Sequence, residues 1–243
     1  MKLTVVGCSP AWPNAGSAQS GYLVEHDGGS LLLECGPGVL ARLRCDRSWP
    51  EPHAIVITHF HLDHWGDLVP WVWGALHFAD LGQPPRRPAL WVPPGGIARL
   101  EHFGELLGFP DMFERVFALH EYTPDAPFTA GGCELTATAV PHYRVEAYGL
   151  RVSDGNRTLA YSGDSGPAPA LATIARDADL FLCEATLERG ELDGEPRGHL
   201  SLDEARAAFD ESGAHALVVT HRPSELESPD EYELAHDGMV LEV

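Results

Sequence analysis

The chain has 243 residues, with 36 acidic and 16 basic side chains, and its formal net charge at pH 7 is −20. This length can bury a sizeable core, and we predict one domain over residues 1–243. The charge disfavours proteins that grip a nucleic-acid backbone, because these need clustered lysine and arginine. No run of 18 apolar residues predicts a membrane span, and the N-terminus has no signal-peptide pattern. The five widely spaced cysteines favour a reduced, cytoplasmic protein.

The first third of the chain predicts mainly strands and turns. Two apolar runs flank Asp27-Gly28-Gly29, which is a hairpin signal. The continuous apolar run at 54–58 is typical of a strand buried on both faces. The strands expected up to residue 88 are 3–8, 22–24, 31–33 and 54–58, the expected helices are 39–44 and 68–78, and Gln83–Pro88 is expected to be a loop.

In the rest of the chain strands and helices alternate. Ser201 is the expected N-cap of a helix, with Glu204 completing a capping box. The expected strands are 89–92, 135–140, 148–153, 158–161, 180–183 and 216–220, and the expected helices are 96–107, 168–175 and 202–211. This order predicts an α+β fold, an αββα sandwich in which two mixed sheets pack face to face with helices on the outer faces.

The five cysteines are widely spaced and form no C-x-x-C motif, which disfavours a disulfide framework or a thiolate zinc site. Cys8, Cys35 and Cys183 lie at or near the ends of apolar runs. We therefore expect these three to be buried as small hydrophobic residues.

The segment 58–64, Thr-His-Phe-His-Leu-Asp-His, lies at the end of a strongly apolar predicted strand. His59 and His61 are two residues apart at the strand's end, so their side chains point the same way. Asp63 and His64 follow in the turn that leaves the strand. Four nitrogen and oxygen ligands within six residues suit a divalent metal of the zinc type. One such ion with three protein ligands leaves Asp63 or His64 spare, which indicates a second metal.

Three further candidate ligands follow the ends of other predicted strands. They are His142, Asp164 and His221. Taken singly, each is an ordinary polar residue after a strand. Taken with the first cluster, their shared placement favours a single metal site assembled from several strand ends.

These residues resemble the metal-binding pattern of the metallo-β-lactamase superfamily. Within it, the chain is similar to the ribonuclease Z-like phosphodiesterase branch, and the similarity extends over nearly the whole sequence. The segments that carry the similarity are 7–9, 21–23, 34–38, 161–165, 181–186, 198–201 and 219–221. The resemblance implies the metallo-β-lactamase fold.

The resemblance also implies a dinuclear centre of two divalent ions, zinc first, with manganese, iron or cobalt as alternatives. Two such ions would lower the pKa of a bridging water, and the resulting hydroxide would attack a phosphodiester. His199 and Glu184 match a pair that protonates the leaving group, and Asp63 is counted among the catalytic residues as well as the ligands. The implied ligands are His59, His61 and His142 for one ion, Asp63, His64 and His221 for the other, and Asp164 for both.

The substrate we expect is a small phosphodiester, a cyclic nucleotide or a cyclic ribose phosphate, because the chain looks most like bacterial cyclic-nucleotide phosphodiesterases of this branch. Enzymes that process tRNA usually carry a long arm between the motifs of His142 and Asp164, and here these positions are only 22 apart. The alternatives are a ribonuclease Z-like RNA endonuclease without that arm, and a hydrolase of a lactone or another ester. A non-catalytic metal-binding sensor is disfavoured, because no ligand is missing.

Several side chains near these motifs are candidates for substrate contact. Trp65, Tyr143 and Ser165 directly follow candidate ligands, and we expect them to line the site. We expect Trp71 and Trp73 to lie in the core or at a subunit contact. The apolar stretch from Trp71 to Phe78 could supply such a contact, so we expect a homodimer. Arg144 could meet a phosphate, whereas Arg86 and Arg87 are expected on a solvated loop. The histidines without an assigned role are His26, His53, His77, His102, His120, His215 and His236.

Overall fold

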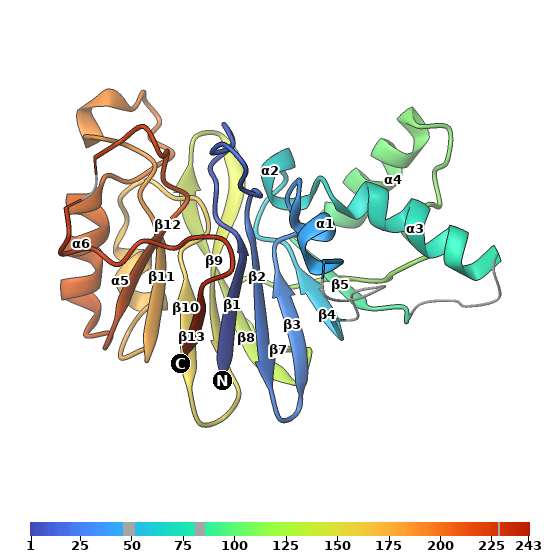
Figure 1. The fold of residues 1–243 in the computed structure, drawn as a ribbon, viewed down its shortest axis with the longest axis horizontal. Helices are drawn as coiled ribbons and strands as arrows, with labels where there is room; N and C mark the ends of the chain where they lie inside the picture. The colour runs from blue at the N-terminus through green and yellow to red at the C-terminus, as the bar shows by residue number, and fades with distance from the viewer. Residues whose placement is uncertain (46–51, 81–85, 228) are drawn as a thin grey trace.

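The computed structural model describes residues 1–45, 52–80, 86–227 and 229–243, leaving out the side chains of 78–80. Within these residues two mixed sheets pack face to face, with helices on both outer faces (Figure 1). The N-terminal and C-terminal strands pair with each other, so the two ends of the chain lie side by side. This is the predicted αββα sandwich.

The first sheet is mixed because its early strands form antiparallel pairs and its later strands run parallel. From β13 through β3 the pairs are antiparallel, and from β3 through β6 they are parallel. Its order is β13 (Val240–Glu242), β1 (Lys2–Gly7), β2 (Gly21–His26), β3 (Gly29–Leu33), β4 (Ala54–Val56), β5 (Ala89–Val92) and β6 (Ala118–Glu121).

The second sheet combines the same two kinds of pairing. The strands β12, β11 and β10 run parallel, and β10, β9, β8 and β7 form an antiparallel meander. The order is β12 (Leu217–Thr220), β11 (Leu180–Glu184), β10 (Thr158–Tyr161), β9 (Val145–Ser153), β8 (Cys133–His142) and β7 (Phe128–Ala130).

Three apolar layers hold the sandwich together. The middle layer lies between the sheets and includes Leu31, Val56 and Leu182, all without exposed surface. A second layer lies under the helices of the first sheet, and a third under those of the second sheet. The helices are α1 (Val39–Leu43), α2 (Leu62–Trp65), α3 (Leu68–Asp80) and α4 (Gly96–Leu106) on one side, and α5 (Pro169–Ile174) and α6 (Leu202–Ser212) on the other, with a short 3₁₀ turn at Gly190–Leu192.

Several local expectations are confirmed. The capping box at the start of α6 is present, with Ser201 and Glu204 in the expected roles. Cys8, Cys35 and Cys183 are buried, and all five cysteines are free. No helix in the described residues is long and apolar enough to cross a membrane.

Other elements differ from the expectation. The strand expected at 54–58 ends at Val56, and the turn expected after it is the short helix α2. The strands β6, β7 and β13 carried no recognisable signal, because each is a short, partly polar strand at the edge of a sheet. The expected loop Gln83–Pro88 lies outside the described residues at 83–85, and so does the side chain of Phe78.

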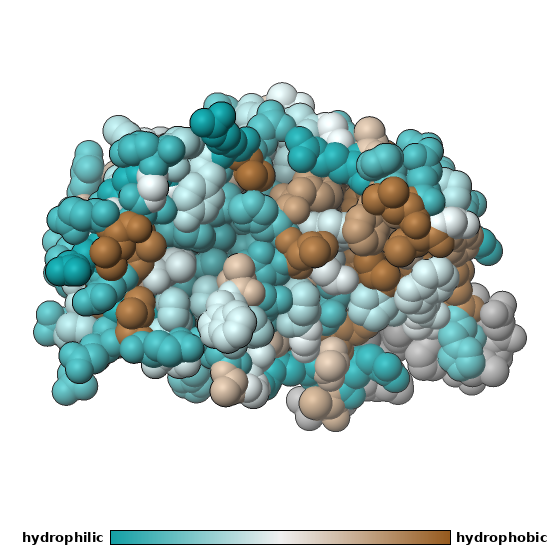
Figure 2. Space-filling model, turned by 90° about the horizontal axis from the view of Figure 1, so that it is seen from above, coloured by the Kyte–Doolittle hydropathy of each residue, from teal (hydrophilic) through white to brown (hydrophobic). Residues whose placement is uncertain are grey.

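The sheet topology brings the candidate ligands to one edge. β3 and β4 run parallel in one sheet, and β10, β11 and β12 run parallel in the other. The carboxyl ends of parallel strands meet at the same edge of a sheet, where α/β proteins place their sites. That edge carries α2 and is the face seen from above in Figure 2, where exposed hydrophobic residues gather mainly on the α3 and α4 side.

Candidate metal centre

The seven side chains expected to bind metal converge at the carboxyl edge of the strands. His59 and His61 follow β4, Asp63 and His64 lie on α2, and His142 ends β8. Asp164 lies three residues after the end of β10, and His221 directly follows β12. Their atoms form two clusters that share Asp164, and within each cluster the potential ligand atoms lie within 4.8 Å of one another.

The first cluster consists of His59, His61, His142 and Asp164. His61 Nδ1 and His142 Nε2 are 2.9 Å apart. His142 Nδ1 lies 2.7 Å from the carbonyl oxygen of Gly198, which can only accept, so Nδ1 carries the proton. The Nε2 lone pair of His142 therefore faces the cluster and is available to a cation.

The orientation of His59 follows from the same reasoning. The Thr58 hydroxyl donates to the carboxylate of Glu34, so its oxygen accepts a hydrogen bond from His59 Nδ1–H at 3.0 Å. This leaves His59 Nε2 unprotonated and directed toward Asp164, whose Oδ2 atom is 3.9 Å away.

The second cluster consists of Asp63, His64, His221 and the shared Asp164. Asp63 Oδ2 lies 3.3 Å from His64 Nε2 and 3.2 Å from His221 Nε2. On the side of the ring away from the cluster, His221 Nδ1 lies 2.8 Å from the Thr186 hydroxyl, and this hydrogen bond orients the ring. Its Nε2 atom thus faces the other members of the cluster.

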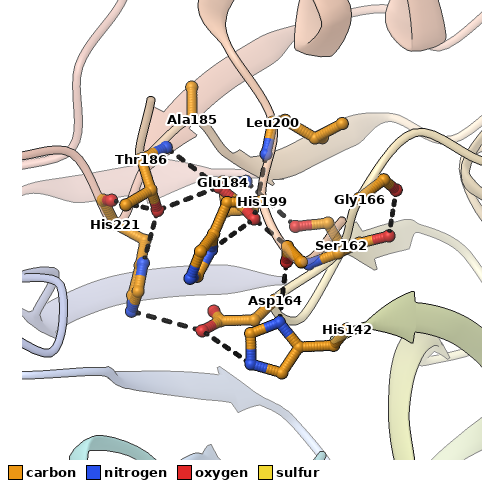
Figure 3. Close-up of polar contacts among 12 residues, drawn as sticks. His142, Ser162, Asp164, Gly166, Glu184, Ala185, Thr186, His199, Leu200 and His221 are labelled. Carbon is orange, nitrogen blue, oxygen red and sulfur yellow. Dashed lines mark hydrogen bonds and ion pairs between the residues drawn. The ribbon is translucent and has the colours of Figure 1, made fainter. Parts of the chain in front are cut away.

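Asp164 occupies the centre of the site. Its Oδ2 atom lies 3.3 to 3.9 Å from the Nε2 atoms of four histidines, namely His64, His221, His142 and His59. Figure 3 shows this carboxylate between His142 and His221. A carboxylate in this position can contact cations in both clusters at once.

The residues fit a pair of divalent cations, and three buried polar atoms in the clusters support this fit. Among the described residues, His59 Nε2, His64 Nε2 and Asp164 Oδ1 are buried without a well-aligned hydrogen-bond partner, and His64 Nε2 meets Asp63 and Asp164 as an ion pair at 3.3 Å. Such atoms cost about 1–3 kcal/mol each when nothing satisfies them. Cations ligated by imidazole and carboxylate would satisfy all three, and this donor set suits zinc, manganese, iron or cobalt.

Protonation in the metal-free protein follows from burial and neighbouring charge. Burial lowers the pKa of His59, His61 and His142, so these imidazoles are neutral, as metal ligation requires. Burial also disfavours a charged His64, but the Asp164, Asp63 and Glu34 carboxylates outweigh it and raise the pKa of His64 well above its usual value. Metal bound at His64 must therefore displace a proton.

Glu34 is a buried acid beside the ligand clusters, and no sequence motif indicated a role for it. It is fully buried directly after β3, and its Oε1 atom lies 3.3 Å from His64 Nδ1. Through Thr58 the same carboxylate also orients His59. A carboxylate behind a metal-binding imidazole fixes the ring and raises its basicity. Only the packing reveals this role, because Glu34 is far in sequence from both histidines.

The loop after Glu34 is tightly constrained against α2. A Cβ atom at Gly36 would lie 1.9 Å from the carbonyl oxygen of Asp63, so no side chain fits there. Cys35 N donates to the carbonyl oxygen of His64 at 2.7 Å. These contacts hold the loop against the helix that carries two of the candidate ligands.

The His199 and Glu184 pair lies directly beside the clusters. His199 Nδ1 donates to Glu184 Oε1 at 2.9 Å, and its ring centroid lies 5.0 Å from that of His142 and 5.7 Å from that of His221. The Thr186 hydroxyl lies 3.0 Å from Glu184 Oε2 and also contacts His221 Nδ1 (Figure 3). A hydrogen-bonded chain therefore runs from His221 through Thr186 and Glu184 to His199.

Three residues of this edge adopt left-handed backbone conformations. Glu34, Tyr143 and His221 have φ values of 61°, 49° and 55°. Non-glycine residues in this region carry strain of order 1–3 kcal/mol, and such strain concentrates at functional sites. Each of the three comes directly after a strand, where the turn redirects its side chain.

The structure corrects two of the three expected substrate contacts. Trp65 is 5% exposed in the core under α3 and α4, and its Nε1 atom donates to the carbonyl oxygen of Phe60 at 3.2 Å. Ser165 is fully buried, and its hydroxyl donates to the carbonyl oxygen of Gly166. Following a ligand in sequence does not place a side chain in the site, because α2 turns Trp65 toward the opposite side.

Tyr143 does lie at the rim of the site. It is 40% exposed, and its ring centroid lies 5.1 Å from that of His142 and 5.5 Å from that of His199. Its neighbour Arg144 is also exposed, at the turn between β8 and β9. These two are the candidates from the sequence that remain available to a substrate.

Other residues that the sequence singled out lie away from the clusters. Arg87 bonds to the carbonyl oxygens of Phe117 and Glu114, and Arg86 contacts His53. Trp71 is buried in the core, whereas Trp73 is 47% exposed and stacks on Phe109, so a homodimer through Trp73 stays a prediction. In the described residues none of the seven unassigned histidines joins a ligand cluster.

A sandwich of two mixed sheets with histidine and aspartate clusters at the strand ends defines the metallo-β-lactamase class. A beta-lactamase superfamily domain model matches residues 30–222. The chain is 32% identical over 227 residues to the probable metallo-hydrolase YhfI of Bacillus subtilis, covering 92% of this chain and 87% of that protein. The crystal structure of YhfI matches with a TM-score of 0.85 and 26% identity, over 99% of this chain and 98% of that one.

Ribonuclease Z of Myxococcus xanthus is also similar, with 27% identity over 308 residues, covering 100% of this chain and 98% of that protein. The chain therefore belongs to the metallo-β-lactamase superfamily, in its ribonuclease Z-like branch, and is a metallo-hydrolase of that family.

Proposed function

We propose that this metallo-hydrolase is a dinuclear phosphodiesterase that cleaves a small phosphodiester, such as a cyclic nucleotide or a cyclic ribose phosphate. The observation that carries the proposal is the position of His199 beside both ligand clusters, with its Nδ1 atom bonded to a buried carboxylate. Diester cleavage with a poor leaving group needs a proton donor at this place.

The side chains divide naturally into two ligand sets. His59, His61 and His142 would hold one ion, Asp63, His64 and His221 the other, and Asp164 would contact both. Zinc is the first candidate for both positions. Two such ions supply an activated water and neutralise the charge on a phosphoryl group. The Glu34 and Thr186 side chains keep the imidazoles oriented for ligation.

The proton for the leaving oxygen comes from His199. Its Nδ1–H donates to Glu184, so Nε2 is the nitrogen that delivers the proton. Glu184 is fully buried and accepts further hydrogen bonds from the backbone N–H groups of Ser165, Thr186 and Leu200. This network leaves the carboxylate one orientation and fixes the tautomer of the imidazole.

The segment between the motifs of His142 and Asp164 supports a small substrate. All of its residues are described, and they form β9, β10 and two short turns. The chain thus has no projecting arm at the position where tRNA-gripping members are expected to carry one. The net charge of −20 also disfavours a large polyanion. Tyr143 is the side chain we propose to contact the organic part of the diester.

A second candidate function is RNA cleavage without that arm, favoured by the similarity to a ribonuclease Z over nearly the full length of both chains. Hydrolysis of a lactone or another ester is a third, since the same centre activates water toward any electrophile. The His199 and Glu184 pair favours the phosphodiester over the lactone.

The experiment is a substrate panel on purified protein, with and without chelator. The panel contains bis-p-nitrophenyl phosphate, 3′,5′-cyclic AMP, 2′,3′-cyclic AMP, a precursor tRNA and an acyl lactone. We expect turnover of the first compound and at least one cyclic nucleotide, lost with chelator and restored by zinc or manganese. Cleavage of the tRNA alone would favour the second candidate, and cleavage of the lactone alone the third. Absence of metal-dependent diester hydrolysis would overturn the proposal.

A further inference from the structure

Asp193 lies in the segment between β11 and α6, and its side chain is only 5% exposed. Its carboxylate accepts four hydrogen bonds. Oδ2 accepts from the backbone N–H groups of Gly198 at 2.8 Å and His199 at 3.1 Å. Oδ1 accepts from the N–H of Gly194 at 3.0 Å and the hydroxyl of Tyr143 at 3.1 Å. One carboxylate therefore joins the backbone of the proposed proton donor to a side chain at the rim of the site.

These contacts fix His199 at two points. Asp193 holds its backbone N–H, and Glu184 holds its Nδ1 atom. A side chain anchored at both ends has little freedom to rotate, because both the Cα position and the ring plane are set. The geometry of a proton donor matters strongly, since a displacement of about 1 Å can cost roughly 10²-fold in rate.

The same carboxylate fixes Tyr143 on the opposite side of the segment. The Tyr143 ring packs on Gly198, where a Cβ atom would lie 2.4 Å from the ring carbons. The Tyr143 backbone N–H donates to the carbonyl oxygen of Arg197 at 3.1 Å. The ring is thereby held beside His142 and His199 instead of swinging freely over the site.

The charges in this contact agree with the hydrogen-bond directions. Burial alone would raise the pKa of Asp193, but hydrogen bonds from Gly198, His199 and Tyr143 outweigh it and hold the pKa below its usual value. The Tyr143 hydroxyl donates to Asp193 Oδ1. Around neutral pH, Asp193 is therefore an acceptor and Tyr143 a donor.

We propose that Asp193 is a positioning residue that holds the proton donor His199 and the substrate-facing ring of Tyr143 in fixed positions relative to each other. The proposal rests on the proposed function of His199 and names the residue that ties proton transfer to substrate contact at this site. Asp193 touches neither the ligand clusters nor the substrate directly. Its link to the clusters is indirect, through Gly198, whose carbonyl oxygen accepts from His142 Nδ1 at 2.7 Å. We therefore expect its effect in the steps that need His199, and the metal content of each variant is measured to separate this effect from weaker ligation by His142.

The test compares two substrates whose leaving groups differ in their need for a proton. A cyclic nucleotide releases a ribose alkoxide, which requires an acid, whereas bis-p-nitrophenyl phosphate releases a stable phenolate. We expect D193A to lower kcat for the cyclic nucleotide by roughly 10–100-fold, as for loss of other orienting partners, and to leave bis-p-nitrophenyl phosphate nearly unaffected. H199A should show the same selectivity and a larger loss.

Two further variants separate positioning from general damage to the fold. D193N keeps one oxygen that can accept from Gly198 and His199, so we expect it to recover most of kcat. Y143F removes only the hydroxyl contact, so we expect a raised KM for the cyclic nucleotide. The matched control is E191A, because Glu191 is an exposed acid in the same segment.

A readout that does not depend on activity follows the amides themselves. Hydrogen–deuterium exchange at Gly198 and His199 should be slow in the wild type and in E191A and fast in D193A, with the bound metal unchanged. Equal loss on both substrates, or unchanged exchange in D193A, would overturn the proposal. If the wild type hydrolyses no diester, the proposed function fails, while the exchange data still decide whether Asp193 holds the segment.

Discussion

Glu184 Oε1 accepts a hydrogen bond from His199 Nδ1 at 2.9 Å, with the carboxylate fully buried and the imidazole side chain 13% exposed. The buried partner is held by the protein, and the exposed partner can reach a substrate. This arrangement fits the role of proton donor that we propose for His199.

Replacing His199 with alanine should slow the cleavage of a cyclic nucleotide by roughly 10²–10⁴-fold, because the leaving oxygen loses its proton donor. The metals should stay, since all seven candidate ligands are intact. Turnover and metal content of the same preparation check this. Loss of metal in the variant would show that His199 is a ligand instead.

In the metal-free protein, the pKa of His199 should depend on the charge of Glu184. Burial lowers its pKa, but the charge and hydrogen bond of Glu184, with Asp164 and Asp193, outweigh burial and raise the pKa to about 9. The imidazole is thus protonated below about pH 9 and loses its proton as the pH rises through that value. E184Q should move the midpoint down toward the usual 6.5. Titration of the histidine ring signals by NMR measures it, and an unchanged midpoint would contradict the assigned cause.

Substituting Glu34 should weaken metal binding without removing a ligand. E34Q takes away the negative charge 3.3 Å from His64 Nδ1, and loss of such a partner costs roughly 10–100-fold in metal affinity. Competition with a chromogenic chelator gives the affinity. The matched control is E25Q on the neighbouring strand β2, whose side chain is 28% exposed and pairs with Lys2. Equal affinities in the two variants would remove Glu34 from the site.

Substituting the shared carboxylate should change the metal stoichiometry. D164N keeps the shape of Asp164 but removes the charge that lies between the Nε2 atoms of four histidines. We expect about two ions per chain in the wild type and one or none in the variant. Elemental analysis after reconstitution and dialysis measures this, with D177N as an exposed control. Two retained ions in D164N would show that Asp164 does not join the clusters.

Trp65 should behave as a core residue. W65F loses the hydrogen bond from Nε1 to the carbonyl oxygen of Phe60 and leaves a small void beside Phe103, which should cost about 1–3 kcal/mol of unfolding free energy. KM for the diester should not change. Chemical denaturation and steady-state kinetics on one preparation separate the two effects, and a raised KM at full stability would restore Trp65 as a substrate contact.

Much of the fold could be predicted because the amino-acid pattern of each central strand is itself typical of a buried strand. Each of β3, β4, β10, β11 and β12 contains an unbroken run of at least three apolar residues, and these runs are largely buried because both faces of the strand are covered. The edge strands β6, β7 and β13 are short and partly polar. Their pairing depends on neighbours far away in sequence, which no local pattern contains.

The sequence by itself determined which side chains form the two clusters. Each of them ends or closely follows a strand, or lies on the short helix just after one, and the parallel strands of a sheet end at one edge. Only the tertiary structure decided which other side chains hold the site residues in place. Glu34, Thr186 and Asp193 act through contacts between distant segments, and left-handed backbone at Glu34, Tyr143 and His221 aims their side chains. Such contacts arise only when the chain is folded, so the sequence alone assigns Glu34, Thr186 and Asp193 no role.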